Sequence, residues 1–347
     1  MDSVTQIVLG AAVGEVVLGK KIGNKAQLFG AIAGTIPDLD VLVTWYLNDP
    51  LAEIVIHRSY SHALFVHILL AIPFAWLTHR LFKRQQTFKE WYLLWFLGFA
   101  THAILDSFTT YGTQLFMPFT NYMVGFNNIS VIDPLYTLPF MFILIYCLFL
   151  KRSNPNRFKW AWRSIYISSA YMALTFAVKG YIHSTFSRQM NAANVSYEHL
   201  STSPAILNNA LWSGIAYNDS TITFGEYSVF QSDRHIDFIT YPRHLELEGE
   251  FAGKELETLK WFSQGMYLLE KKDSATLNFY VVKWGRMDLS QRIPDQTFRF
   301  YYQLKKDPLQ KGNIIMTAVR PDFKEGEFSK ALGQLWDRIW EKPKTAY

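Results

Sequence analysis

Residues 91–108 read WYLLWFLGFATHAILDSF, an apolar segment that nevertheless carries an imidazole, His102, and a carboxylate, Asp106. Ionisable groups are costly inside a membrane-spanning helix and usually mark a functional site there. The two residues are spaced i,i+4, so on a helix they share one face and can reach one ion, or the carboxylate can orient the imidazole. The alternative is structural: the pair forms a hydrogen bond that holds two helices together.

Five further apolar segments occur in the same half of the chain. A membrane-spanning helix needs about 20 such residues, and the first and fifth segments are marginal by this measure. The six segments cover residues 4–18, 26–47, 63–82, 91–108, 135–150 and 160–178. We expect the first segment to be retained, because it lacks the basic start of a cleaved signal sequence. The sequence therefore predicts an α-helical polytopic membrane domain of about six transmembrane helices over residues 1–180.

The second half of the chain has a different composition. The 347 residues are 50% hydrophobic, and the mean hydropathy of +0.02 averages two unlike halves. Alternating stretches at residues 221–224, 277–282 and 298–302 predict strands, and residues 328–340 predict an amphipathic helix. We therefore expect a small soluble α+β domain over residues 181–347. The single cysteine, Cys147, excludes an intrachain disulfide bond.

The basic residues predict an orientation in the membrane. The net charge is +5, and Lys and Arg gather in short loops rather than along one polar face, so we do not expect nucleic-acid binding. Three alternate loops carry these residues, at positions 20–25, 80–89 and 151–163. The positive-inside rule places such loops in the cytoplasm. The amino terminus and the carboxyl-terminal domain are then expected to be extracytoplasmic.

Seven Asp and His residues of the first half converge on the opposite, outer side in this topology. Carboxylates and imidazoles bind divalent metals, and we predict six of the seven as metal ligands: Asp38, Asp40, His57, His62, His102 and Asp106. Pro37 should interrupt its helix and allow both nearby aspartates to point into one cavity. A structural role for these carboxylates is less favourable, because two buried carboxylates without a cation repel each other.

Two further residues are predicted to take part in catalysis. Arg58 is the only cation between residues 48 and 61 and suits a phosphate oxygen or the charge of a transition state. Asp133 reaches the same side, although a carboxylate before Pro134 can equally cap the following helix.

Residues 108–126, between Asp106 and Asp133 in the sequence, form an aromatic loop without charge. It is either a lid that shapes a lipid-accessible pocket or an aromatic belt at the headgroups.

These motifs together resemble a known family. The stretches at residues 37–40 (PDLD), 57–63 (HRSYSHA), 98–106 (GFATHAILD) and 110–112 (TYG), with Met117-Pro118, are similar to those of the YdjM family of bacterial inner-membrane, metal-dependent hydrolases. The resemblance covers roughly residues 1–150. It implies a helical membrane domain, a zinc-type site of one or two ions and a location in the bacterial inner membrane. Gln6 departs from the pattern, since many relatives carry a histidine there.

Three functions follow as hypotheses. In the first, a membrane-bound hydrolase uses one or two divalent ions, zinc by preference, to cleave a phosphoester, and the outer location favours a lipid or lipid-linked substrate. In the second, the same residues move protons or metal ions, which the one-sided location disfavours. In the third, the chain is a non-catalytic membrane scaffold. The sequence does not indicate an oligomeric state.

Overall fold

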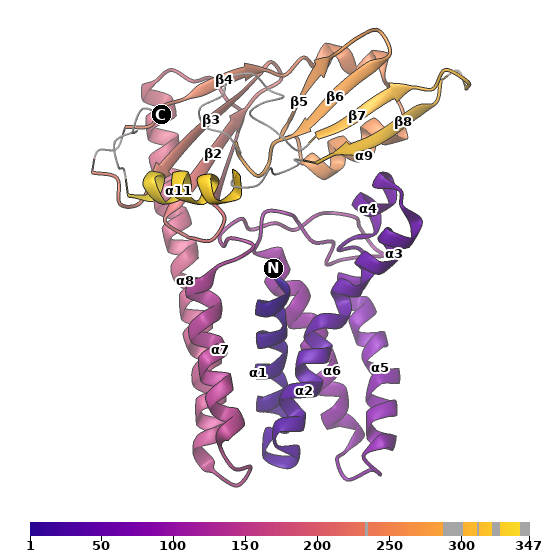
Figure 1. Ribbon diagram of the computed structural model, residues 1–347, viewed down its shortest axis with the longest axis vertical. Coiled ribbons are helices and arrows are strands. Elements are labelled where there is room, and N and C mark those ends of the chain that lie inside the picture. Colours follow the sequence, from indigo (N-terminus) through magenta and orange to yellow (C-terminus); the bar gives the residue numbers. More distant parts are fainter. Residues whose placement is uncertain (233–234, 287–300, 311, 321–326, 341–347) are drawn as a thin grey trace. The chain divides into compact units, whose positions relative to one another are not determined.

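The computed structural model divides the chain into two compact units. The first comprises Met1–Ala177 and Ile206–Asn208, and the second comprises Val178–Ala205 and Asn209–Tyr347. The structure describes residues 1–232, 235–286, 301–310, 312–320 and 327–340. Each unit is described separately below, and helix α8 (Pro155–Ala192) contributes to both of them (Figure 1).

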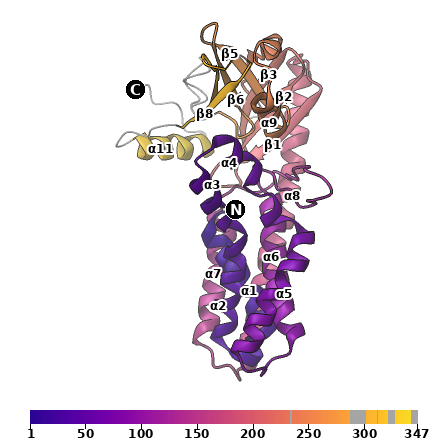
Figure 2. The same ribbon diagram turned by 90° about the vertical axis from the view of Figure 1, so that its right-hand side faces the viewer.

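The first unit is helical. Its long helices run side by side in two perpendicular views (Figures 1 and 2). The elements are α1 (Ser3–Ile22), α2 (Asn24–Thr35), the 3-10 helix η1 (Ile36–Leu39), α3 (Asp40–Leu47), α4 (Pro50–Ile56), the 3-10 helix η2 (Tyr60–His62), α5 (Leu64–Leu81), α6 (Phe88–Ser107), α7 (Pro134–Phe149) and the first part of α8. The helical class predicted for this half of the chain is confirmed.

Helices α1 and α2 form a hairpin held together by close backbone contact. Each contributes a pair of glycines four residues apart, Gly10 and Gly14 on α1 and Gly30 and Gly34 on α2. A Cβ atom on Gly14 would lie 2.0 Å from the carbonyl oxygen of Ala26, and one on Gly30 would lie 2.1 Å from that of Gly10. Small residues at this spacing let helix backbones approach closely, which is a main source of helix association in membranes.

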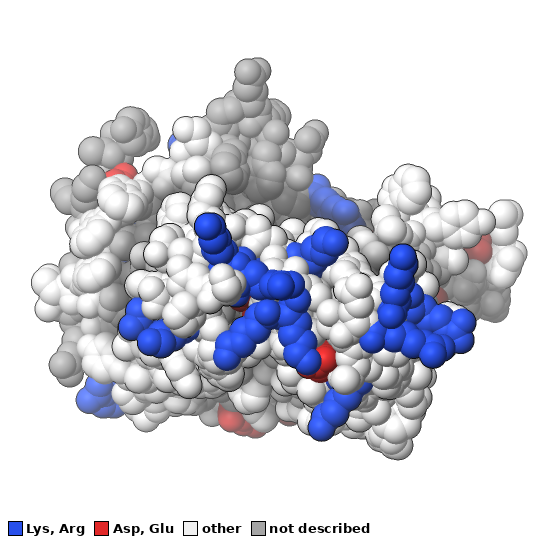
Figure 3. Space-filling view, turned by 90° about the horizontal axis from the view of Figure 1, so that it is seen from below, with Lys and Arg blue, Asp and Glu red and all other residues white. Residues whose placement is uncertain are grey.

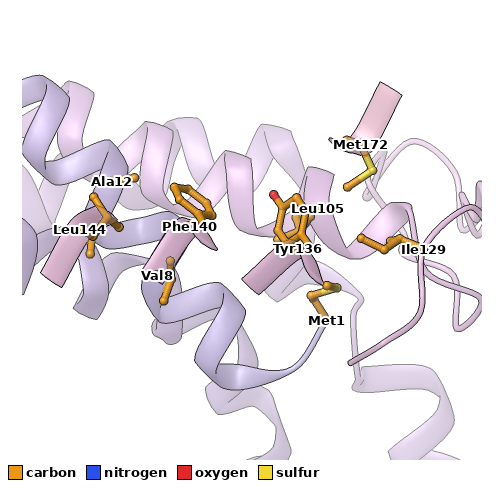
Figure 4. Close-up of a cluster of buried hydrophobic side chains, with 10 residues drawn as sticks. Met1, Val8, Ala12, Leu105, Ile129, Tyr136, Phe140, Leu144 and Met172 are labelled. Atoms are coloured by element: carbon orange, nitrogen blue, oxygen red, sulfur yellow. The ribbon is translucent and has the colours of Figure 1, made fainter. Parts of the chain in front are cut away.

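Two apolar clusters surround this hairpin. One packs α1 against α7 and includes Val8, Ala12, Phe140 and Leu144 (Figure 4). The other packs α2 against α5 and α6 around the buried Trp91. Gly98 of α6 lies so close to α2 that an added Cβ would meet the Ala33 Cβ at 2.5 Å. The helices that carry the ionisable residues are therefore held in fixed register with α1 and α2.

The three basic loops meet at one end of this unit. Lys and Arg gather there when the molecule is seen from below (Figure 3). Arg152 donates to the Lys21 carbonyl at 3.0 Å, which joins the third basic loop to the first. Above them, the buried Arg157 pairs with Glu15 through Nε–Oε1 at 2.5 Å and Nη2–Oε2 at 2.6 Å. The assignment of this end to the cytoplasm stays a prediction.

Fewer helices than the six expected have the length and hydropathy of a membrane span. Among the described residues, three helical segments are long and apolar enough to cross a membrane: Ser3–Ile22, Asn24–Leu47 and Leu64–Leu81. Helix α7 is apolar but has only 16 residues. Helix α6 includes Glu90, His102 and Asp106, and α8 includes several Lys, Ser and Tyr residues, and these lower the mean hydropathy of both helices.

The second unit contains two antiparallel sheets. The first has the order β1 (His199–Pro204), β2 (Leu211–Tyr217), β3 (Thr221–Ser228) and β4 (Ile239–Pro242), and the second has the order β5 (Tyr267–Lys271), β6 (Thr276–Val281), β7 (Tyr301–Lys306) and β8 (Ile314–Val319). The 3-10 helix η3 (Leu245–Glu250) and α9 (Lys254–Ser263) lie between the sheets in the sequence, and α11 (Glu327–Ile339) follows them. Apolar residues of both sheets share one core, which includes Ile215, Phe224, Leu268 and Tyr280.

The strands expected at residues 221–224 and 277–282 correspond to β3 and β6, and the expected carboxyl-terminal helix corresponds to α11. The strand expected at 298–302 corresponds in part to β7, and residues 298–300 lie outside the described residues.

Candidate metal centre

Four ionisable side chains converge at the end of the helices opposite the basic loops. Asp38 comes from η1, His62 from η2, and His102 and Asp106 from α6, and one ligand atom from each lies within 4.8 Å of all the others. The Nε2 atom of His62 lies 3.4 Å from Oδ1 of Asp38 and 3.3 Å from Oδ2 of Asp106. The Nε2 atom of His102 lies 3.1 Å from Nε2 of His62, 3.4 Å from Asp38 Oδ1 and 4.0 Å from Asp106 Oδ2.

These separations fit a tetrahedral metal ion. Zinc binds imidazole nitrogen and carboxylate oxygen at about 2.0–2.2 Å, which sets the ligand atoms of a tetrahedral site about 3.4 Å apart. The cluster shows four of its separations between 3.1 and 3.4 Å. Two nitrogens and two oxygens are also a donor set that suits zinc and similar divalent ions.

Hydrogen bonds behind the two imidazoles turn their lone pairs toward the cluster. His102 Nδ1 lies 2.6 Å from the carbonyl oxygen of Gly34, and since a carbonyl only accepts, this nitrogen carries the proton. Ser61 donates its hydroxyl proton to Asp40 at 2.6 Å, so it accepts from His62 Nδ1 at 2.9 Å. Both Nε2 atoms are then unprotonated in the neutral rings, and they face each other and two carboxylate oxygens. Such an arrangement of acceptor atoms suits a bound cation.

Asp106 uses its two oxygens for different contacts. Its Oδ1 atom accepts from Gln6 Nε2 at 2.8 Å and contacts the Met1 amino group. Its Oδ2 atom is buried and has no hydrogen bond, although it lies 2.9 Å from Arg58 Nε at ion-pair distance. This oxygen is the one that faces the two histidines.

The local backbone explains why Asp38 and Asp40 separate. Pro37 lies at the start of η1, a 3-10 turn between α2 and α3. Asp38 lies within this turn, whereas Asp40 begins α3, and the two carboxylates therefore leave the chain in different directions. Asp38 joins the metal cluster, and Asp40 lies beside it.

Asp40 and His57, the other two predicted ligands, form a hydrogen-bonded pair next to the cluster. His57 Nδ1 lies 2.9 Å from Asp40 Oδ1. The other oxygen of Asp40 accepts from the Arg58 backbone nitrogen at 2.9 Å and from Ser61. Asp40 thus organises the segment that carries His57, Arg58 and His62. The structure brings four of the six predicted ligands together and places these two beside them.

Arg58 is buried beside the cluster. Its φ of 58° is in the left-handed region, which a non-glycine residue adopts only where the surroundings enforce it. The guanidinium donates from Nη1 to Thr109 Oγ1 at 3.1 Å and lies over the Tyr111 ring at 4.9 Å. Its position next to Asp106 offsets the negative charge that the cluster concentrates.

Asp133 lies apart from the cluster. It is the amino-terminal cap of α7, where Oδ1 accepts from the backbone nitrogens of Leu135 and Tyr136 at 3.0 and 3.2 Å. Its Oδ2 atom accepts from the Tyr171 hydroxyl at 2.9 Å. Burial raises the pKa of the Asp133 carboxyl, and the hydrogen bond from Tyr171 opposes this shift. These contacts match the capping alternative.

Three groups that support the site were not identified from the sequence. They are the Gly34 carbonyl, Ser61 and Thr109. A backbone carbonyl has no residue-type signal. Ser61 does have one, because it immediately precedes His62 in a segment of closely spaced polar residues.

Comparisons with known proteins identify the family of the chain. The family described as "YdjM inner membrane protein" matches residues 1–184, which is more than half of the chain. The "Uncharacterized protein YfhP" of Bacillus subtilis (strain 168) is 28% identical over 141 residues, which cover 39% of this chain and 42% of that protein. No solved structure matches the chain.

Proposed function

Since the chain belongs to the YdjM family of inner membrane proteins, we propose that it is a membrane-bound, metal-dependent hydrolase that cleaves a phosphoester of a lipid or lipid-linked substrate. The observation that carries this proposal is the convergence of four potential ligand atoms, from Asp38, His62, His102 and Asp106, within 4.8 Å of one another. A divalent ion, zinc by preference, satisfies all four at once.

The proposed chemistry is hydrolytic. A divalent ion bound by these residues would supply Lewis acidity, which activates water for attack and polarises a phosphoryl oxygen. Arg58 suits the second requirement of phosphoester cleavage, because a guanidinium beside the cluster can bind phosphate oxygens and stabilise their developing charge. Asp40 holds the backbone nitrogen of Arg58 and the Ser61 hydroxyl, so it keeps Arg58 and His62 in their places.

Exposure indicates how a substrate reaches the centre. His62, His102 and Asp106 are completely buried, whereas the Asp38 side chain is 23% exposed and that of His57 is 20% exposed. Solvent and substrate therefore approach on the side of Asp38 and His57. Under the proposed topology this side faces the outer leaflet, and the carboxyl-terminal unit is extracytoplasmic.

Metal analysis tests the assignment. We expect purified protein to retain a divalent metal and to hydrolyse phosphoesters, and we expect His102→Ala and Asp38→Ala to lose most of both. His79→Ala is the matched control, because His79 bonds to the Gln86 carbonyl outside the cluster and should leave the metal content unchanged. Metal retained at wild-type stoichiometry in both ligand variants would reject the assignment.

A further inference from the structure

The loop between α6 and α7 is charge-free and has a fixed base. No Lys, Arg, Asp or Glu occurs between residues 109 and 132. Two backbone hydrogen bonds of 2.9 Å pair Thr113 with Val124 and close the loop. Thr113, Gln114, Leu115 and Met123 are buried at this base. Residues 113–124 therefore form a defined projection rather than a loose connection.

The tip of this projection exposes aromatic side chains. Phe116, Phe119 and Tyr122 are 49%, 75% and 64% exposed, and we call these three residues the aromatic tip. Phe119 also contacts the Phe65 ring at the start of α5, at 5.3 Å between ring centroids. Exposed aromatic residues without charged neighbours are unusual on a surface that faces water, and they are typical of the membrane interface.

The same loop is hydrogen-bonded to the segment that carries Arg58 and His62. The Gln114 backbone nitrogen donates to the Arg58 carbonyl at 3.0 Å, and the Leu64 nitrogen donates to the Leu115 carbonyl at 3.0 Å. The Thr109 hydroxyl accepts from the Arg58 guanidinium. The segment with Arg58 and His62 is thus hydrogen-bonded on one side to Asp40 and on the other side to the base of the loop that carries the aromatic tip.

Membrane chemistry fixes the depth of this assembly. Non-helical backbone is not tolerated facing hydrocarbon, because its unpaired polar groups find no partner there. The loop follows directly on α6, which carries Asp106 in its last turn, and the basic loops lie at the other end of the unit (Figures 1 and 3). The loop and the metal centre therefore belong at the level of the lipid headgroups, where aromatic side chains partition favourably.

We propose that the aromatic tip inserts into the headgroup region of the bilayer and docks an amphiphilic substrate, so that its headgroup phosphoester lies beside the Asp38 side of the metal centre. The docking role rests on the hydrolase function proposed above, whereas the insertion does not. The partner of this loop is then lipid rather than a second protein.

Site-directed spin labelling tests the insertion without reference to activity. The full chain is placed in nanodiscs of phosphatidylethanolamine and phosphatidylglycerol, with a nitroxide on Phe119→Cys or Tyr122→Cys. We expect both labels to collide with oxygen and to be shielded from a water-soluble nickel complex. A label on Asp219→Cys, at an exposed position of the second unit, is the control that the nickel complex should reach. The only native cysteine, Cys147, is buried, so wild-type protein gives the labelling background. Nickel access at 119 and 122 equal to that at 219 would overturn the insertion.

Turnover tests the docking. Phe119→Ser/Tyr122→Ser should lower hydrolysis of nanodisc phospholipid about tenfold, since two aromatic contacts with the bilayer are lost, and should leave hydrolysis of the soluble diester bis(p-nitrophenyl) phosphate and the metal content unchanged. An equal loss on both substrates would refute docking, as would wild-type protein that cleaves only the soluble diester. Wild-type protein that cleaves neither would instead reject the hydrolase proposal and leave the spin-label result standing.

Discussion

At the scale of single residues, Ser61 connects the Asp40 carboxylate to the His62 imidazole. Its hydroxyl donates to Asp40 and accepts from His62 Nδ1, so it fixes both the tautomer and the orientation of that ring. Removal of such an outer partner typically costs about 10- to 100-fold in metal affinity. We therefore predict that Ser61→Ala weakens metal binding by about this factor while saturating metal still restores full occupancy. Competition with a chromophoric chelator measures the affinity.

Ser59→Ala is the control for this variant. Ser59 is buried in the same segment and makes its hydrogen bonds through the backbone, which the substitution keeps: its nitrogen donates to the Ile56 carbonyl at 3.1 Å and its carbonyl accepts from the His62 nitrogen at 2.9 Å. We expect its metal affinity to stay within about twofold of wild type, as for a residue outside the network of partners. An affinity loss of the same size in both serine variants would show that the segment responds to any change, and the specific role of Ser61 would be refuted.

The residue types of the site could be predicted from the sequence, but which of these residues join the cluster and which support it could not. Asp38 and Asp40 have the same chemistry and nearly the same position, and only the 3-10 turn after Pro37 directs one to the cluster and the other to His57. The sequence marks an interruption at Pro37 without giving its geometry. The Gly34 carbonyl, which orients His102, depends on how closely α2 approaches α6, and no local pattern reports that distance.

At the scale of elements, the α1–α2 hairpin sets the position of that carbonyl. A methyl group on Gly14 would overlap the Ala26 carbonyl, and the two helices would have to move apart. Overpacking of this kind costs about 1–3 kcal/mol. We predict that Gly14→Ala lowers the thermal unfolding temperature and also lowers metal retention, because Gly34 moves away from His102. Unfolding in detergent and metal analysis of the same sample measure both effects.

Gly180→Ala is the matched control for this helix substitution. Gly180 lies within α8, and a Cβ atom there meets nothing within 4 Å. Replacing a mid-helix glycine by alanine in open space should stabilise the helix by about 0.5–1 kcal/mol. If Gly14→Ala behaved like Gly180→Ala, the close contact between α1 and α2 would have no energetic consequence.

Apolar patterning predicted the helices better than their ends. The segment expected at residues 26–47 is one apolar run in the sequence, but the structure divides it into α2, η1 and α3. The segment expected at 160–178 is the middle of α8, which continues in both directions with polar residues. Hydropathy detects burial in lipid or protein alike, so it predicts a helix in each case, including helices that fall short of the length or hydropathy of a membrane span.

At the scale of the whole molecule, charge separates the two ends of the first unit. The basic loops gather at one end (Figure 3), and the metal centre and the charge-free loop lie at the other end of the helices (Figure 1). The buried pair of Glu15 and Arg157, which Gln27 completes through a 3.0 Å hydrogen bond, joins α1, α2 and α8 near the basic end. The charges of Glu15 and Arg157 compensate each other, so this second polar cluster holds the three helices together. It differs in this from the acceptor-rich centre at the opposite end.

This polarity predicts the topology in intact cells. The positive-inside rule places residues 80–89 in the cytoplasm and the second unit on the outer side. A cysteine at Lys83 should therefore react with a membrane-impermeant maleimide only after the cells are lysed, whereas a cysteine at Asp219 should react in intact cells. Both positions are exposed, so a difference in labelling reports the side of the membrane rather than burial. The reverse pattern would place the metal centre at the cytoplasmic leaflet and redirect the search for its substrate to that side. Labelling of both positions in intact cells would contradict a fixed orientation of the chain.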